Sequence, residues 1–240
     1  MESTISGNIS NVKERIAAAC ERAGRDPKEV TLIAVSKLKP FEDIMEAKNA
    51  GATDFGENYV QELVEKIGKN SETCGEATPT VRWHMIGHLQ KNKVKYLIGQ
   101  TALIHSVDSL FLAEQIEKEL AKKDEITRIL LEVNVAEEES KWGFTTESVK
   151  EAAAEIGKLP HVRVLGLMTS APITEDPESN RVYFRKLNEL AHEMLKENLL
   201  VKDPSFSCPV LSMGMTGDFE VAVEEGATMV RVGTAIFGKR

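Results

Sequence analysis

A nearly unbroken run of apolar and β-branched residues, Thr31-Leu32-Ile33-Ala34-Val35, leads into Ser36-Lys37 and stops at Leu38-Lys39-Pro40. A short apolar run between turn signals is typical of a strand buried on both faces, as in a parallel sheet. Lys37 would then stand at the end of a rigid strand, where partial loss of hydration makes its amine available to attack a carbonyl. The alternative is an ordinary lysine whose ammonium reaches solvent from the strand end.

Strand-like and helix-like segments alternate along the whole chain. The predicted strands are 31–37, 52–55, 81–86, 102–107, 126–135, 162–168, 210–212 and 229–232. The predicted helices are 5–23, 40–48, 59–67, 89–98, 109–122, 147–158 and 178–197, with a short helix after Gly217 and a long loop at 68–80. Regular alternation implies a parallel sheet, and eight such units in roughly 250 residues suit a (β/α)8 barrel. An open doubly wound sheet is the alternative, but no G-x-G-x-x-G follows a strand.

We therefore predict a single TIM-barrel domain over residues 1–240 with an extra helix at its N-terminus. The chain starts with a helix, and its last predicted strand ends at Val232, close to the C-terminal residue Arg240. We expect the N-terminal helix to fill the place in the outer ring that an eighth helix would otherwise take.

Composition excludes several classes of partner. The net charge is −8, from 30 basic and 38 acidic residues, and no basic block of the kind that binds nucleic acid or a membrane surface occurs. Cys20, Cys74 and Cys208 have no metal-ligand spacing and would leave one cysteine unpaired in any disulfide scheme, which favours reduced thiols. The sequence has neither a signal-peptide core nor a run of transmembrane length, so we expect a cytoplasmic protein without a metal site.

The loops after the last two predicted strands combine glycines with small hydroxyl side chains. Sites of such barrels lie at the carboxyl ends of the strands, and phosphate commonly binds after strands 7 and 8. Ser212, Gly214, Gly233 and Thr234 would let hydroxyl and backbone N–H groups approach an anion, and the helix after Gly217 adds a favourable dipole. This pattern predicts a phosphate cup, although ordinary strand-to-helix turns also favour these residue types.

Arg231 is the least expected residue of the last strand. Strand alternation places Met229 and Arg231 on one face and Val230 and Val232 on the other, so the arginine would point into the barrel. A buried charge there needs a partner, either a carboxylate or a ligand atom. A lysine amine, a phosphate cup and an inward arginine together fit pyridoxal 5′-phosphate. Lys37 would form the Schiff base, and Arg231, which can only donate, would hydrogen-bond the pyridine nitrogen and keep it unprotonated.

Several motifs, taken in order, resemble the pyridoxal phosphate homeostasis protein family. They are Val35-Ser36-Lys37, Phe55-Gly56-Glu57-Asn58-Tyr59, the run from Trp83 to Lys93, Lys141-Trp142-Gly143-Phe144, Gly166-Leu167-Met168, the run from Leu211 to Asp218 and the run from Val230 to Gly238. The resemblance implies a barrel like the N-terminal domain of alanine racemase, with the cofactor on Lys37. It also implies a role in storing, carrying or buffering vitamin B6 without established catalysis. His88 and Trp142 are small departures from the family's motifs.

The predicted cofactor-binding set contains no catalytic residue and no metal ligand. It comprises Lys37, Asn58, His84, Met168, Ser212, Met213, Gly214, Arg231, Gly233 and Thr234. Asn58 and His84 have structural roles as their alternative, and Lys141 is either a second cofactor-handling amine or a solvated loop lysine.

Two enzymatic functions compete with the binding role. The first is an amino-acid racemase, although such racemases take their second base from a C-terminal β domain for which this chain has no room. The second is a Schiff-base aldolase that acts on a phosphorylated sugar. We also expect transfer of the cofactor to pyridoxal phosphate-dependent apoenzymes, and a monomer or weak dimer.

Overall fold

Eight parallel strands close into a barrel in the computed structural model, which describes residues 4–73, 81–138, 140–207 and 209–239. The strands are β1 (Thr31–Val35), β2 (Asp54–Glu57), β3 (Arg82–Met85), β4 (Leu103–Val107), β5 (Thr127–Glu132), β6 (Val162–Met168), β7 (Val210–Met215) and β8 (Met229–Val232). They follow one another in sequence order around the barrel, and β8 pairs with β1. The predicted (β/α)8 barrel is confirmed.

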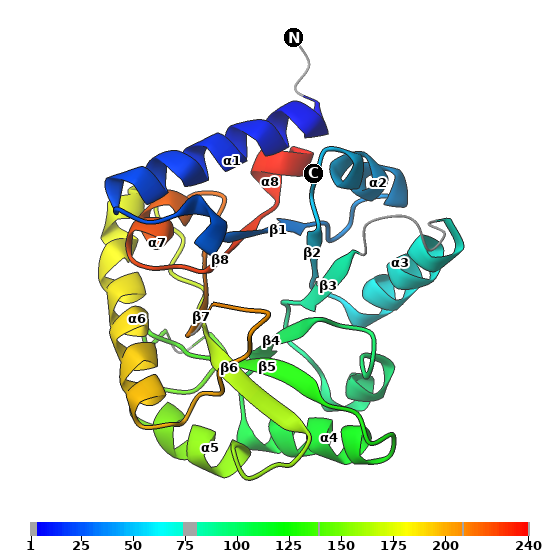
Figure 1. The fold of residues 1–240 in the computed structure, drawn as a ribbon, viewed down its shortest axis with the longest axis vertical. Coiled ribbons are helices and arrows are strands. Elements are labelled where there is room, and N and C mark those ends of the chain that lie inside the picture. Colours follow the sequence, from blue (N-terminus) through cyan, green and yellow to red (C-terminus); the bar gives the residue numbers. More distant parts are fainter. Residues whose placement is uncertain (1–3, 74–80, 139, 208, 240) are drawn as a thin grey trace.

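A ring of helices surrounds the barrel (Figure 1). The α-helices are α1 (Ile5–Arg22), α2 (Phe41–Asn49), α3 (Val60–Thr73), α4 (Leu110–Ala121), α5 (Val149–Ile156), α6 (Arg181–Lys196), α7 (Phe219–Glu224) and α8 (Thr234–Phe237). The 3₁₀ helices are η1 (Pro27–Glu29), η2 (Lys91–Tyr96) and η3 (Pro177–Asn180). In the described part of the chain, no helix combines the length and the apolar character that a membrane crossing requires.

Helix α1 closes the ring beside the short α8 and also contacts α2 and α7 (Figure 1). The Thr4 side chain caps its first turn by accepting from the Gly7 N–H at 3.1 Å. Its buried face carries Ile9, Val12 and Ile16. The Asn8 side chain donates to the Ile236 carbonyl at 2.8 Å, which ties α1 directly to α8. The N-terminal helix therefore takes the place predicted for it.

The buried apolar side chains form two layers, one inside the barrel and one around it. The inner layer consists of Ile33, Leu103, Leu130, Leu165, Met168, Val210 and Met229. The larger outer layer lies between strands and helices and includes Val230 and Val232. The predicted alternation of β8 is therefore confirmed, and Arg231 shares the inward face with Met229.

The element boundaries differ from the prediction in several places, among them the following four. Strand β2 starts two residues later and includes Glu57, because its ladder with β3 continues to the pair Glu57–Met85. The predicted helix 89–98 is instead η2, where 3₁₀-type bonds such as Lys93 N–H to Gln90 O tighten the turn. Strand β5 ends at Glu132 rather than residue 135. Helix α3 extends to Thr73 into the predicted loop, and residues 74–80, with Cys74, and Cys208 lie outside the described residues.

Candidate functional site

Lys37 lies in a tight turn at the carboxyl end of β1. The Lys39 N–H donates to the Ser36 carbonyl at 3.0 Å, so Lys37 and Leu38 form the corner of the turn. Leu38 has φ = 59°, in the left-handed region that non-glycine residues seldom occupy. The Lys39 ammonium donates to the Phe237 carbonyl at 2.7 Å, which joins this turn to α8. Lys37 is therefore held on a fixed corner next to the loop that follows β8.

Arg231 is buried at the same end of the barrel, with only 5% of its surface exposed. Its guanidinium donates to four neutral oxygens: the Ser212 carbonyl at 2.7 Å, the Ser212 hydroxyl at 2.8 Å, the Thr169 carbonyl at 2.9 Å and the Ser170 hydroxyl at 3.3 Å. These contacts fix the plane of the guanidinium across the ends of β6 and β7. Burial lowers the pKa of Arg231 to about 10, so the group remains charged at neutral pH.

Glu132, at the end of β5, is the carboxylate that acts most strongly on Arg231. Burial and, to a smaller extent, the nearby Asp108 raise the pKa of Glu132 to about 7, while Arg231 opposes the shift. A carboxyl group that titrates near neutrality therefore lies at the mouth of the barrel. Glu132 is absent from the predicted set of site residues.

A continuous chain of hydrogen bonds crosses the barrel interior below Arg231. The Ser212 hydroxyl contacts His105 Nδ1 at 2.8 Å, and His105 Nε2 contacts His84 Nδ1 at 2.9 Å. His84 Nε2 contacts Asp54 Oδ1 at 2.9 Å, and Arg82 pairs with Asp54 Oδ2 at 2.8 Å near the amino ends of the strands. We call the five residues Asp54, His84, His105, Ser212 and Arg231 the interior chain. It links the guanidinium at the mouth to a carboxylate near the opposite end of the barrel.

With both imidazoles neutral, the two ends of the interior chain set the direction of the hydrogen bonds between them. Arg231 can only donate, and an ionised Asp54 can only accept. His84 then donates from Nε2 to Asp54, His105 donates from Nε2 to His84, and Ser212 donates to His105 Nδ1. Burial works against the charge of Asp54, but hydrogen bonds from His84, Arg82 and Thr53 hold its pKa below the ordinary value. Burial, with His84 and Arg231 nearby, keeps the pKa of His105 well below its usual range, so His105 stays neutral.

The loops after β7 and β8 approach each other closely. Gly214 has φ = 87°, and a Cβ there would lie 2.5 Å from the Ala222 Cβ. Asp218 shapes this loop by accepting from the Met215 N–H at 2.7 Å and from the Asn180 side chain at 2.8 Å. The Gly233 N–H donates to the Thr216 hydroxyl at 3.3 Å, which links the two loops. The two segments predicted to form a phosphate cup thus lie next to each other, and Gly233 packs against Val35 at the end of β1.

The other residues predicted to contact the cofactor lie in different surroundings. Asn58 lines a pocket of about 370 Å³ beside the mouth, together with Tyr59, His88 and Gln90. Met168 is buried in the inner layer, and Thr234 is exposed at the start of α8. The Met213 side chain packs in the outer layer, so only its backbone can face the mouth. The hydroxyl of Ser212 and both ring nitrogens of His84 are engaged in the interior chain rather than turned to the mouth.

Lys141 lies at the rim with Trp142. Its ammonium pairs with Glu138 at 2.5 Å and donates to the Ser170 carbonyl at 3.0 Å. The Trp142 ring, 62% exposed, stacks on His88 with centroids 4.4 Å apart. Ser170 also contacts Arg231, so Lys141 is one residue away from the guanidinium.

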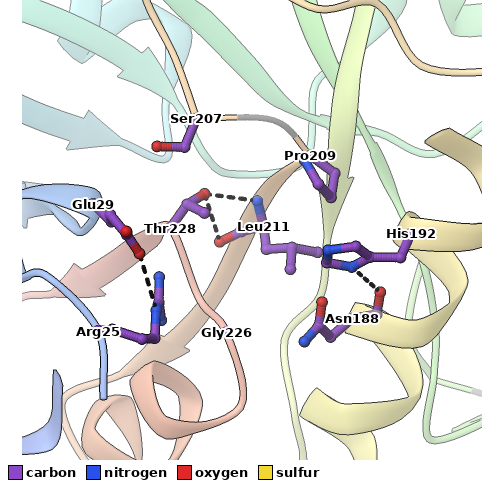
Figure 2. Close-up of a pocket in the computed structure, with 9 residues that line it drawn as sticks. All are labelled: Arg25, Glu29, Asn188, His192, Ser207, Pro209, Leu211, Gly226 and Thr228. Carbon is purple, nitrogen blue, oxygen red and sulfur yellow. Dashed lines mark hydrogen bonds and ion pairs between the residues drawn. The ribbon is translucent and has the colours of Figure 1, made fainter. Parts of the chain in front are cut away.

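A polar pocket of about 380 Å³ lies at the opposite end of the barrel (Figure 2). Its lining residues are Arg25, Glu29, Asn188, His192, Ser207, Pro209, Leu211, Gly226 and Thr228. Several of its polar groups are engaged with neighbours: the Thr228 hydroxyl accepts from the Leu211 N–H at 2.8 Å, and Arg25 donates to Glu29 at 3.4 Å (Figure 2). This pocket borders the starts of β7 and β8 and is separate from the Lys37 turn. In the described part of the chain, no cluster of His, Cys, Asp or Glu suits a metal ion.

Comparison with known proteins gives a consistent result over the whole chain. Residues 8–240 match the family model for the alanine racemase N-terminal domain. The chain is 47% identical over 232 residues to a pyridoxal phosphate homeostasis protein of Aquifex aeolicus, covering 97% of this chain and 96% of the relative. It is 39% identical over 236 residues to the protein of the same description in Escherichia coli K12, covering 98% and 97%.

The fold is also similar to a solved structure, that of PipY of Synechococcus elongatus PCC7942 with PLP bound, at a TM-score of 0.77 and 32% sequence identity. The match covers 95% of this chain and all of that one.

Proposed function

This chain belongs to the pyridoxal phosphate homeostasis protein family, and on that premise we propose that it binds pyridoxal 5′-phosphate on Lys37 and takes part in intracellular vitamin B6 homeostasis. The observation that carries the proposal is the convergence of the Lys37 turn, the buried Arg231 and the glycine loops after β7 and β8 at one end of the barrel.

The residues at the mouth suit this cofactor. A phosphate is bound by backbone N–H groups of closely packed loops, and the glycines let these segments pack tightly: a Cβ at Gly233 would lie 3.3 Å from Val35, and a Cβ at Gly214 would collide with α7. A ring nitrogen that stays unprotonated needs a donor-only partner, and the Arg231 guanidinium is one whose present partners are all neutral oxygens. These two features, both near the turn that carries Lys37, support the proposal.

Bound pyridoxal phosphate supplies an aldehyde that a lysine amine can attack. In our proposal Lys37 provides that amine, and the backbone N–H groups around Gly214, Gly233 and Thr234 hold the phosphate. Arg231 faces the ring nitrogen, and the interior chain holds Arg231 in place. Asn58 and Met168 would complete the walls of the site.

The assignment of Lys37 can be tested with the purified protein. We expect an absorbance band in the visible after incubation with pyridoxal phosphate, and reduction with borohydride should leave the pyridoxyl label on the peptide that contains Lys37. Lys37→Ala should abolish the band, whereas Lys141→Ala, which removes another amine at the mouth, should keep it. A label found chiefly on Lys141 or any other lysine would overturn the assignment.

We further propose that the role is one of binding and transfer rather than catalysis. The names of the relatives support homeostasis, and we expect handover of the cofactor to pyridoxal phosphate-dependent apoenzymes in the cytoplasm by a monomer or weak dimer. Incubating the loaded protein with an apoenzyme in a dialysis-separated and a mixed arrangement tests direct handover. Equal rates of apoenzyme activation in the two arrangements would contradict it.

A further inference from the structure

A buried lysine, Lys66, lies beside the Lys37 turn, and its ammonium donates to three protein acceptors. Lys66 of α3 is 5% exposed, and its ammonium donates to the Ser36 carbonyl at 2.7 Å, Glu57 Oε1 at 2.8 Å and Glu62 Oε1 at 2.6 Å. An ammonium has three N–H donors, so all of them are used. Each N–H group of Lys66 therefore has a protein acceptor, and the side chain is tied to the Lys37 turn and to two carboxylates.

The same group of side chains holds both neighbours of Lys37. The Ser36 hydroxyl donates to Glu57 Oε1 at 2.6 Å, and Ser36 is thus held at its hydroxyl by Glu57 and at its carbonyl by Lys66. On the other side, the Leu38 N–H donates to Glu62 Oε1 at 2.6 Å. One oxygen of Glu62 therefore bridges the Lys66 ammonium and the backbone of the turn.

From these contacts we propose that Lys66, Glu57 and Glu62 form a cage that positions Lys37 by clamping the peptide units on either side of it. The left-handed conformation of Leu38 supports this reading, because a non-glycine residue keeps such a φ only where its surroundings impose it. The burial of the cage is the second support: Glu57 is fully buried, and burial raises its pKa while Lys66 and Ser36 oppose that rise. The cage residues act through the backbone and are positioning residues.

The proposal deepens the proposed function and rests on Lys37 being the residue that holds the cofactor. Glu62→Ala is the sharpest test, because it removes the acceptor of the Leu38 N–H. The hydrogen bonds from Lys66 to Glu57 and to the Ser36 carbonyl do not involve Glu62 and should remain. Glu65→Ala is the matched control: Glu65 pairs with Lys69 at 2.7 Å on the same helix and with the same spacing, but that pair is exposed. Glu62→Gln is the rescue variant, because it retains an oxygen that can accept from Leu38.

Two measurements separate positioning from a general structural role. In the cofactor-free protein, amide hydrogen exchange should show protection of the Leu38 N–H in wild type, Glu65→Ala and Glu62→Gln, and its loss in Glu62→Ala. With pyridoxal phosphate and borohydride, the rate of labelling at Lys37 should fall at least about tenfold in Glu62→Ala, since displacement of a reacting group by about 1 Å can cost up to about a hundredfold. Glu65→Ala should stay within about twofold of wild type, and Glu62→Gln should recover most of the rate.

The outcomes are distinct from those that test the proposed function. If wild type itself is not labelled at Lys37, the proposed function fails. If wild type is labelled there and Glu62→Ala labels at the rate of Glu65→Ala, or labels slowly with the Leu38 amide still protected, the cage proposal is overturned. Lys66→Met should also slow labelling, and should it fail to fold, the comparison of the Glu62 variants decides alone.

Discussion

Replacing His105 with leucine should reveal how strongly the interior chain is coupled. His105 is fully buried, and its loss leaves two groups without a partner: His84 Nδ1 and the proton of the Ser212 hydroxyl, whose oxygen still accepts from Arg231. Each buried polar group left without a hydrogen bond costs about 1–3 kcal/mol, so two cost about 2–6 kcal/mol. Leucine is apolar and of similar size, which recovers part of this, and we expect a net loss of about 2–4 kcal/mol in the free energy of unfolding.

A double-mutant cycle makes the prediction specific. His84→Leu leaves Asp54 Oδ1 and His105 Nε2 without partners, so the two single variants together leave four groups unpaired. The double variant leaves only Asp54 Oδ1 and the proton of the Ser212 hydroxyl without partners. The double variant should therefore be more stable than the sum of the single effects predicts, by at least about 2 kcal/mol.

Urea unfolding of the cofactor-free protein, followed by fluorescence and far-ultraviolet circular dichroism, measures these differences. His192→Leu serves as the control because His192 is exposed on α6, and it should change stability by less than about 0.5 kcal/mol. A coupling energy below about 0.5 kcal/mol would refute an energetically continuous chain. Nitrogen-15 NMR of histidine-labelled protein adds a second check, since His84 and His105 should both carry their proton on Nε2.

Two further predictions concern the mouth of the barrel. The pKa of Glu132, about 7 against an ordinary 4.5, means that the folded protein binds its proton more tightly, which stabilises the fold by roughly 3 kcal/mol below pH 4.5. This contribution is lost as pH rises through 7, so Glu132→Gln should weaken the fall in stability between pH 4.5 and 7 in urea titrations, and an unchanged pH profile would contradict the raised pKa. Gly214→Ala should cost about 2–4 kcal/mol in thermal or urea unfolding, because it places a Cβ at φ = 87° and 2.9 Å from the Phe219 Cα. Gly217→Ala, whose Cβ would meet nothing within 4 Å, should cost far less, and equal losses would argue against the close approach.

Local patterns in the sequence were sufficient to predict the barrel and the direction of Arg231. Alternation of apolar strands with helices fixes the parallel sheet, and two-residue periodicity in β8 separates Val230 and Val232 from Arg231. The ends of elements were less predictable, because tertiary contacts decide them. Glu57, for example, belongs to β2 since the neighbouring strand provides partners up to Met85.

Contacts across the barrel could not be predicted in the same way. His105 and Ser212 are separated by 107 positions, and their contact depends on how far each strand is shifted against the next when the barrel closes. A signal was nevertheless present in the sequence, since His84 lies between the apolar Trp83 and Met85 and His105 follows the apolar pair Leu103-Ile104. The cage around Lys37 was hidden for a different reason: Lys66 resembles any surface lysine of an amphipathic helix until the position of β2 is known.

The interior chain also constrains how the sequence of this barrel can change over evolutionary time. Its protons all point from a guanidinium toward a carboxylate, so each member needs the donor on one side and the acceptor on the other. A substitution at one position alone leaves buried polar groups without hydrogen bonds, whereas apolar replacement of all the members together leaves none of their polar groups unpaired. We therefore expect substitutions at these five positions to be tolerated best when they are made together, and Asp54 and Arg231, at the two ends, set the direction of the hydrogen bonds between them.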